Sequence, residues 1–391
     1  MEYRLDELFD LQMGKTPSRN NSEYWNSEDH KWISISDLSK CGKYIYETKE
    51  YISDKAVRES GISLIPANTV IMSFKLSIGK TAITPEPMYS NEAIMSFRDK
   101  KVVELLPDYI YYMFSGKDWD TGTNKAVMGK TLNKTTLSQV KIKVHSPAEQ
   151  QQIVRVLDKA KAVIESRQQE LQKLDDLIKA QFVEMFGDLA DPTCKWDKLK
   201  LIDTCKKSDD IKCGPFGTQL SKDEYQNSGV AVWEIPQINT GFLSKPTHYL
   251  SKEKADELED YSIISGDIAM SRKGNVGKCA IFPDGFDKGV IHSDVLRIRL
   301  DRERINPDFM MRQLHYSGSV QRQIEIVSSG AIMAGVNVTK LKHIYVHVPP
   351  KELQDKFAAF VKQIDKSKFI VQKALDETQL LFDSLMQKYF S

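Results

Sequence analysis

The chain has 391 residues, with 55 Lys or Arg and 54 Asp or Glu, so its net charge is +1. This length suggests two to three domains of about 150 residues each. With 41% hydrophobic and 28% charged residues, the composition is typical of a globular protein. The balanced charge excludes a protein-wide basic field but allows local basic patches. No apolar run approaches the about 20 residues of a membrane span, so we expect no contact with a membrane.

The five cysteines predict free thiols rather than disulfides or a zinc site. No two of them form a Cys-x-x-Cys pair; they are Cys41, Cys194, Cys205, Cys213 and Cys279. An odd, scattered set of this kind is typical of a reducing cytoplasm. The N-terminus has no signal-peptide core. We therefore expect a cytoplasmic protein.

The sequence repeats itself with a period near 200 residues. Gly79-Lys80-Thr81-Ala82-Ile83 recurs 198 residues later as Gly277-Lys278-Cys279-Ala280-Ile281. Further pairs follow in the same order: Ser90-Asn91-Glu92-Ala93 with His292-Ser293-Asp294-Val295, Pro107-Asp108 with Pro307-Asp308, Leu132-Asn133 with Val336-Asn337, and Pro147-x-Glu149-x-Gln151 with Pro350-x-Glu352-x-Gln354. A shared order over this distance predicts two copies of one fold with diverged side chains.

Each copy divides into a domain and a long helix. Short alternating segments separated by Gly, Pro and Asn turns predict strands, and hence mixed α/β domains, in residues 1–146 and 191–349. These domains are called the first and second repeat below. The two long helices are predicted in residues 147–190 and 350–391.

The two predicted helices carry apolar residues at alternating spacings of four and three. The first has Ile153, Leu157, Ala160, Ile164, Leu171, Leu174, Ile178 and Met185, and the second has Phe357, Val361, Ile364, Val371, Leu375, Phe382, Leu385 and Tyr389. A period of 3.5 residues predicts a coiled coil, and each helix, at 1.5 Å per residue, spans roughly 60 Å. The alternative is two unrelated surface helices. A duplicated chain closes most simply by pairing them antiparallel, with pseudo-twofold symmetry and one domain at each end.

Motifs for an active site are incomplete. Three Gly-Lys-Thr triplets, beginning at Gly14, Gly79 and Gly129, lack the upstream glycine of a phosphate-binding loop. No Gly-x-Gly occurs, which argues against a dinucleotide or S-adenosylmethionine loop. Asn306-Pro307-Asp308-Phe309 lacks the second proline of the adenine-methyltransferase motif. His343 and His347 lie on a strand-like segment without acidic or cysteine ligands nearby, so we predict no metal site.

This doubled organisation resembles the specificity subunit of type I restriction–modification systems over essentially the whole chain. Met13-Gly14-Lys15-Thr16-Pro17-Ser18 is similar to the family's Gly-x-Thr-Pro-Ser turn, and Gly214-Pro215-Phe216-Gly217-Thr218-x-Leu220 matches its Gly-Pro-Phe-Gly-Ser/Thr-x-Leu turn. The resemblance implies two similar α/β target recognition domains in tandem, joined by two long antiparallel coiled-coil helices.

The resemblance also implies a function. It implies a non-catalytic adaptor of a prokaryotic cytoplasm that reads a bipartite site in double-stranded DNA with a fixed unread gap. Its partners would be two methylase subunits and the motor–nuclease restriction subunits. It would need no cofactor itself, because S-adenosylmethionine, ATP and Mg²⁺ would act on those partners. Two alternatives stay open: a DNA-binding scaffold of another defence system, and a degenerate DNA methyltransferase or nuclease.

The predicted DNA-binding residues are polar and basic side chains in the repeated loops. In the first repeat they are Lys15, Thr16, Ser18, Arg19, Ser36, Lys75, Ser77, Lys80, Lys130, Asn133 and Lys134. In the second they are Gln219, Lys222, Gln237, Arg272, Lys273, Asn275, Lys278 and Asn337. Lys and Arg neutralise phosphates, whereas Asn, Gln and Arg can also read base edges. The alternative for each is an ordinary solvated side chain.

Two further sets concern turns and partners. Five glycines are expected to shape turns: Gly14, Gly79, Gly214, Gly217 and Gly277. Helix positions beside the predicted seam are candidates for binding the methylase: Gln150, Arg155, Phe182, Phe186 and Phe390.

Overall fold

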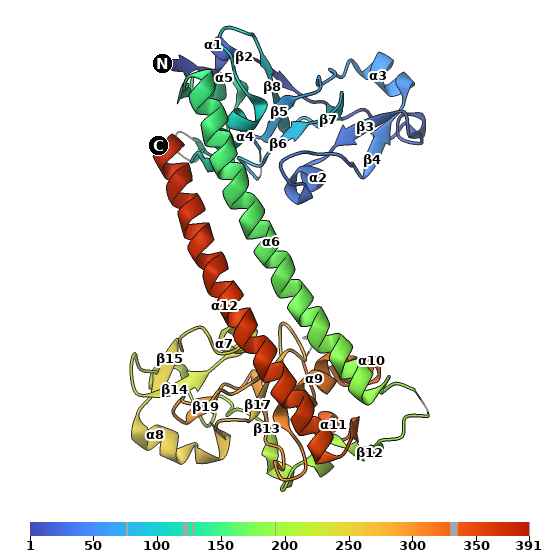
Figure 1. Cartoon of the computed structure of the whole chain (residues 1–391), viewed down its shortest axis with the longest axis vertical. Helices are drawn as coiled ribbons and strands as arrows, with labels where there is room; N and C mark the ends of the chain where they lie inside the picture. The colour runs from blue at the N-terminus through green and yellow to red at the C-terminus, as the bar shows by residue number, and fades with distance from the viewer. Residues whose placement is uncertain (76, 120–123, 127–128, 192, 329–334, 391) are drawn as a thin grey trace. The chain divides into compact units, whose positions relative to one another are not determined.

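The structure is a computed structural model of the chain, and it describes all residues except 76, 120–123, 127–128, 192, 329–334 and 391 (Figure 1). The side chains of residues 124–126 and 129–131 are also outside the description. The chain forms two compact units. Unit 1 comprises Met1–Gln168 and Gln372–Ser391, and unit 2 comprises Gln169–Val371. Each unit therefore contains one repeat and part of both long helices. The boundary between the units lies within the two helices, not at their ends.

The first repeat contains two main sheets. One has the strand order β2-β8-β5-β6 and is antiparallel: β2 (Phe9–Met13), β8 (Ile94–Asp99), β5 (Thr69–Ser73) and β6 (Thr81–Thr84). The other has the order β4-β3-β7: β4 (Glu50–Ile52), β3 (His30–Ile33) and β7 (Tyr89–Ser90). Two small pairs are β1 (Glu2–Arg4) with β11 (Lys141–Lys143), and β9 (Asn124–Ala126) with β10 (Gly129–Thr131). The helices are α1 (Leu5–Leu8), α2 (Ile35–Lys40), α3 (Asp54–Ser60), α4 (Pro107–Gly116) and α5 (Lys134–Ser138).

The second repeat has the same order in its first sheet and one additional strand, β16, in its second. Its first sheet runs β13-β20-β17-β18: β13 (Ile211–Cys213), β20 (Val295–Ile298), β17 (Ile268–Ser271) and β18 (Cys279–Ile281). Its second runs β15-β14-β19-β16: β15 (His248–Leu250), β14 (Val230–Trp233), β19 (Gly289–Ile291) and β16 (Ser262–Ile263). The small pair is β12 (Asp197–Lys200) with β21 (Tyr345–Val348). The helices are α7 (Ile235–Asn239), α8 (Lys252–Glu257), α9 (Pro307–Tyr316), α10 (Gly318–Ser328) and α11 (Val338–Leu341).

The shared strand order confirms the internal duplication. The order β2-β8-β5-β6 is matched strand for strand by β13-β20-β17-β18, and α4 is matched by α9, each starting at a proline. The copies differ after that helix, where the first repeat has the hairpin β9–β10 and the second has α10. The mixed helix-and-sheet fold predicted from the sequence is therefore confirmed.

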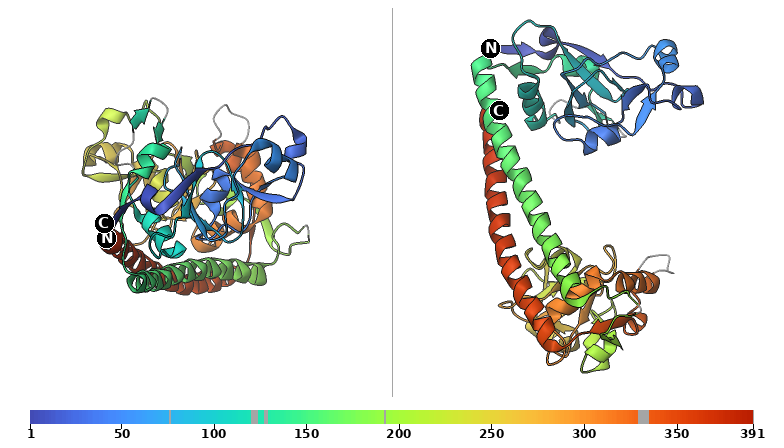
Figure 2. Two further views of the ribbon diagram at one scale, coloured as in Figure 1. Left: turned by 90° about the horizontal axis from the view of Figure 1, so that it is seen from above. Right: turned by 45° about the vertical axis from the view of Figure 1, so that its right-hand side comes forward.

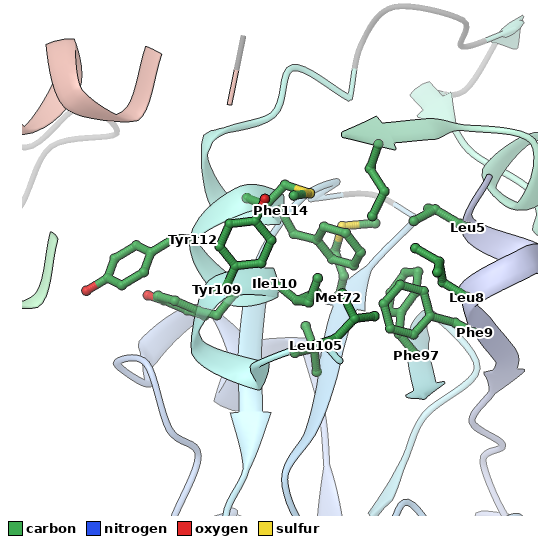
Figure 3. Close-up of a cluster of buried hydrophobic side chains, with 14 of the residues drawn as sticks. Leu5, Leu8, Phe9, Met72, Phe97, Leu105, Tyr109, Ile110, Tyr112 and Phe114 are labelled. Carbon is green, nitrogen blue, oxygen red and sulfur yellow. The ribbon is translucent and has the colours of Figure 1, made fainter. Parts of the chain in front are cut away.

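The core of the first repeat forms where α4 packs on the four-stranded sheet (Figure 3). Phe97 on β8 meets Phe114 on α4 with ring centroids 4.7 Å apart, and Phe9 on β2 contacts both rings. Leu5 and Leu8 of α1 are fully buried against the same cluster. Burial of each such side chain contributes roughly 1.5–3 kcal/mol relative to exposure. This core fixes the strands from which the loops of the candidate site emerge.

Each long helix is attached to its repeat by one buried glutamine. The helices are α6 (Pro147–Phe186) and α12 (Lys351–Phe390). Gln150 accepts a hydrogen bond from Leu106 N (3.0 Å) and donates to two backbone carbonyls. Gln354 accepts one from Asn306 N (2.8 Å) and also donates to two carbonyls. Both side chains are fully buried, because the acceptor and both donors of each amide are paired with backbone groups.

This geometry corrects the predicted alignment of the Pro-x-Glu-x-Gln motifs. The sequence pairs Gln151 with Gln354, but the structural counterpart of Gln354 is Gln150, whereas Gln151 is exposed. The reason is that α6 begins at Pro147 and α12 at Lys351, so equivalent helix positions are 204 residues apart. Gln150 is consequently part of the fold and is removed from the candidates for partner binding.

In unit 2 the two long helices pair antiparallel (Figures 1 and 2). Phe182 of α6 contacts Phe357 of α12, with ring centroids 5.5 Å apart. Earlier on α6, Asp175 pairs with Lys368, which lies later on α12, at 2.6 Å. Because an earlier position on α6 contacts a later position on α12, the two helices are antiparallel, as predicted. Phe186 and Phe182 are buried here, so neither presents a surface to a partner.

In unit 1 the predicted seam residues also contact the first repeat. Ile153 and Leu157 of α6 are buried in the core of that repeat. From α12, Phe382 lies 6.3 Å from Tyr112 and Phe390 lies 5.5 Å from Tyr109 between ring centroids. Each helix thus uses its apolar residues to dock on a domain as well as to meet the other helix, which the sequence pattern did not distinguish.

No helix in the described part of the chain is long and apolar enough to cross a bilayer.

Candidate nucleic-acid interface

Four segments that are distant in the sequence meet at one end of the first repeat. They are residues 14–19, residues 74–75 and 77–80, residues 91–93 and residues 132–134, which we call the first turn cluster. Backbone hydrogen bonds tie them: Gly14 N to Ile94 O (3.1 Å), Lys15 N to Ser90 O (2.8 Å), Phe74 N to Ala93 O (3.0 Å) and Leu132 N to Phe74 O (3.1 Å). The cluster brings together most of the DNA-binding residues predicted for this repeat.

The second repeat builds the same arrangement, the second turn cluster, from residues 214–219, 272–278, 292–294 and 335–337. Its ties are Gly214 N to Val295 O (3.1 Å), Arg272 N to Asp294 O (2.8 Å) and Val336 N to Arg272 O (3.0 Å). The backbone scaffold is therefore duplicated together with the fold.

These bonds correct a second predicted alignment. The sequence pairs Glu92 with Asp294, but the structure pairs Ala93 with Asp294 and Glu92 with Ser293. Asn91 Oδ1 accepts from Ala93 N, and His292 Nδ1 accepts from Asp294 N in the same way. Strand register agrees, because Ile94 faces Ser73 on β5 and Val295 faces Ser271 on β17. The alignment from sequence is one residue out of register here because it matches the two acidic residues, Glu92 and Asp294, to each other.

Glycines shape these clusters at four of the five predicted positions. A Cβ on Gly14 would lie 2.2 Å from Ser90 O, and one on Gly214 would lie 2.2 Å from Ile291 O. Gly79 and Gly277 have φ of +86° and +81°, in the left-handed region that favours glycine. Gly217 has neither a close neighbour nor a positive φ. A turn requirement is therefore not visible at Gly217.

Cationic side chains line the first turn cluster. Lys15, Ser18, Arg19, Ser77 and Lys80 are exposed, and Thr16 and Lys75 are partly exposed. The Arg19 guanidinium lies 3.7 Å from the Trp25 ring centroid and pairs with Glu50, so its plane is held in place. Trp25 and Glu50 were not among the residues predicted from the sequence.

Glu92 is a further member of the first cluster that the sequence analysis missed. The Thr16 hydroxyl donates a hydrogen bond to its carboxylate. This bond is the largest cause that lowers the pKa of Glu92 below its usual value, and the charges of Lys75 and Arg19 lower the pKa further. The group is therefore an anion at neutral pH.

The second turn cluster carries different side chains on the same backbone. Phe216 occupies the position of Thr16 and is 49% exposed, and the Arg272 guanidinium lies 5.4 Å from its ring centroid. Arg272 also donates to Val336 O (3.3 Å) and Ser293 O (3.5 Å), which restrains it. Lys273 pairs with Asp294 at 2.9 Å.

Three predicted residues of the second repeat are exposed but bonded within it. Gln219 accepts a hydrogen bond from Tyr261 Oη at 3.0 Å. Lys278 donates to Asn239 O (3.0 Å), and Asn275 lies 3.5 Å from the Asn239 side chain. Asn275 and Lys278, in the turn that follows β17, therefore share Asn239 as a partner, whereas Gln219 is held by Tyr261.

Three other predicted DNA-binding residues serve the fold. Asn133 and Asn337 are equivalent helix caps, accepting from Thr136 N (2.8 Å) and Lys340 N (3.0 Å). Gln237 is 1% exposed; it donates to Lys245 O and accepts from Glu234 N. The prediction for Gln237 is corrected, because a buried amide with both ends bonded does not present itself to DNA.

The backbone bonds of the two clusters do not include three further predicted residues, which are Ser36 on α2, Lys134 at the start of α5 and Lys222. All three are exposed, and Lys134 follows the helix cap Asn133 at the edge of the first turn cluster. Lys130 belongs to β10, and its side chain lies outside the described residues.

A neutral histidine supports the turn that carries Lys278. Cys279 N donates to His315 Nε2 at 3.0 Å, so that nitrogen must be unprotonated. Burial lowers the pKa of His315 to about 4, against about 6.5 in an unfolded chain. The unfolded state therefore takes up a proton first as the pH falls.

We expect the contribution of His315 to the stability of unit 2 to be constant above about pH 6.5 and to fall by about 2–3 kcal/mol as the pH drops toward 4. Burial also lowers the pKa of His347, so that residue adds to the loss. His315→Gln, which does not titrate, should flatten this loss. Urea unfolding at pH 7 and at pH 5 for both proteins measures it. An identical pH dependence in the two would show that His315 does not contribute.

The part of the chain that the structure describes contains no group of three or more His, Cys, Asp or Glu side chains that could hold a metal.

Comparison with known proteins places the chain in a family. It matches the family described as the type I restriction modification DNA specificity domain over residues 1–176 and 195–378. The specificity subunit of the type I restriction enzyme MjaIX of Methanocaldococcus jannaschii is 22% identical, over 98% of this chain and 91% of that protein. The specificity subunit of EcoR124I/EcoR124II of Escherichia coli is 30% identical over 45% of this chain and 44% of that protein.

A solved structure shows the same fold. The S subunit of a type I restriction–modification system from M. genitalium superposes with a TM-score of 0.60 at 14% identity, covering 100% of this chain and 96% of that one. The match to the family covers both halves of the chain, as expected from its two repeats and two long helices. This chain belongs to the type I restriction modification DNA specificity family.

Proposed function

We propose that this chain is the DNA-specificity subunit of a type I restriction–modification complex, which reads a bipartite site in double-stranded DNA and carries no catalytic centre of its own. The observation that carries the proposal is the turn cluster, built twice on one backbone scaffold with different side chains. A shared scaffold suits one kind of ligand, and different side chains suit two half-sites of different sequence.

The charges of the clusters support binding to a nucleic acid. Lys15, Lys75 and Lys80 in the first cluster, and Lys273 and Lys278 in the second, gather cations on a chain whose net charge is only +1. Such cations neutralise phosphates and position a duplex. Because they are few, we expect tight binding only when partner subunits add contacts to the duplex.

Catalysis and cofactors are assigned to partner subunits in this proposal. We assign S-adenosylmethionine to the methylase subunits, and ATP with Mg²⁺ to the motor–nuclease subunits. The absence of any Gly-x-Gly from the sequence supports this division for S-adenosylmethionine.

A methylome tests the proposal. The chain is co-expressed with a methylase subunit encoded beside it, in a host without adenine methylation, and modified bases are mapped by sequencing. We expect one new motif in two parts with a fixed gap, lost when this chain is omitted. Methylation that is indifferent to this chain, or a continuous motif, would contradict the proposal. Methyl transfer or cleavage by the purified chain alone would favour the enzyme alternative.

Exposed apolar residues on the long helices suit a partner protein. On α12, Phe369 and Ile370 are 67% and 68% exposed in unit 2, and Leu380 and Leu381 are 70% and 56% exposed in unit 1. Exposed apolar residues so placed are typical of a protein interface. They replace the predicted contacts Gln150, Phe182 and Phe186, which are buried; Arg155 remains exposed, and Phe390 packs against Tyr109.

We expect Phe369→Asp combined with Ile370→Asp to weaken binding of the methylase subunit at least about 100-fold, as for a substitution in an interface hot spot. Gln372→Asp, on an exposed flank of the same helix, should change binding less than about threefold. Titration calorimetry with the purified methylase subunit measures both. Equal affinity of the double variant and the wild type would place the interface elsewhere.

A further inference from the structure

Glu92 is an anion at the centre of the cationic first turn cluster. It lies between β7 and β8, is exposed, and receives a hydrogen bond from the Thr16 hydroxyl on its Oε2 atom. One oxygen is thereby fixed, and Oε1 is left as an acceptor in a defined orientation. The cluster around it presents Lys15, Arg19 and Lys75.

The presence of this carboxylate in the cluster is not explained by an ion pair. Among the described residues, no Lys, Arg or His nitrogen lies within 4.0 Å of Glu92; Lys15 Nζ instead donates to Ser60 O (2.5 Å), and Arg19 pairs with Glu50. In the second cluster, Asp294 does hold a cation, Lys273, at 2.9 Å. The two acidic residues therefore have different roles, as their different positions in the turn already indicate.

The chemistry of DNA limits what such a carboxylate can contact. An ionised carboxylate only accepts hydrogen bonds, and the phosphates and sugars of DNA offer only acceptors. In the major groove, donors are the amino groups of adenine N6 and cytosine N4. A carboxylate on a DNA-facing surface is repelled by the phosphates, and a hydrogen bond from one of these amino groups offsets that repulsion.

We propose that Glu92 is a specificity-determining residue that accepts a hydrogen bond from the exocyclic amino group of an adenine or a cytosine in the half-site read by the first repeat. Thr16 is its positioning residue. The equivalent position in the second repeat is Ser293, so the two repeats read this position differently. The inference rests on the proposed function and adds the chemical group that one side chain recognises.

Two experiments with the assembled complex of this chain and its methylase test it. The first compares methylomes of wild type, Glu92→Gln, Glu92→Ala and the control Asp10→Asn, which removes an exposed charge from the other end of β2. We expect Glu92→Ala to lose about tenfold of the discrimination at one base pair of one half-site, and Glu92→Gln, whose amide oxygen is still an acceptor, to lose less. The other half-site and the Asp10→Asn motif should be unchanged.

The second experiment measures binding to duplexes in which that base is replaced by an analogue without the amino group, purine for adenine or 2-pyrimidinone for cytosine. We expect one analogue to weaken wild-type binding about tenfold and to leave Glu92→Ala binding unchanged; which analogue does so identifies the base. An unchanged motif in Glu92→Ala, or a uniform loss at all sites, would overturn the inference. A wild-type complex without a split motif would instead overturn the proposed function.

Discussion

Replacement of Phe182 by alanine is expected to lower the free energy of unfolding of unit 2 by about 4 kcal/mol. Phe182 is 2% exposed and joins three parts of the unit. Its ring centroid lies 5.8 Å from that of Phe309 on α9, 5.5 Å from Phe357 on α12 and 5.0 Å from Phe186 on its own helix. Removal of the ring leaves a cavity among aromatic side chains that cannot collapse easily. Urea unfolding followed by tryptophan fluorescence measures the loss.

The matched control is Phe369→Ala, because Phe369 is 67% exposed on a long helix of the same unit. We expect this variant to unfold within about 0.5 kcal/mol of wild type. Similar losses in the two variants would mean that the aromatic cluster does not anchor the helices to the second repeat.

Replacement of Gly214 by alanine is expected to destabilise unit 2 by about 3 kcal/mol and to reduce methylation of the complete site at least tenfold. A Cβ at this position would lie 2.2 Å from Ile291 O and 2.4 Å from His292 O, both of them backbone atoms. The turn must therefore move away from β19, which displaces Phe216 and the other side chains of the second cluster. Unfolding and methylation assays measure the two effects.

Gly217 offers the control within the same motif. Nothing lies within 4 Å of a Cβ there, and its φ is not positive. Gly217→Ala should therefore be close to neutral for stability. If both variants behave alike, the close approach at Gly214 does not organise the second turn cluster.

The repeat and the helices could be predicted from the sequence because their signals are long. A 198-residue recurrence around Gly79 and Gly277, and a seam sustained over about five heptads, survive extensive divergence of individual side chains. The turns at Gly79 and Gly277 could also be predicted, since a left-handed φ restricts the residue type. Both features depend on the backbone, which the duplication preserves.

Individual contacts could not be predicted, because local geometry decides them. Asn133 and Asn337 have the composition of base-reading residues but cap short helices. Gln237 is buried, and Glu92 was passed over although it lies in a recognised motif. The offset between the repeats also changes along the chain, from 198 residues at Gly79 to 204 at Gln150, so motif alignment by likeness misplaced two pairs.

Exchange of the second repeat tests the central claim most directly. Residues 197–348, from the start of β12 to the end of β21, are replaced by the corresponding segment of another specificity subunit, and the methylome of the chimaera is compared with that of wild type. The account predicts that one half of the split motif changes while the other half is retained. A change in both halves, or in neither, would contradict a chain in which each repeat reads its own half-site.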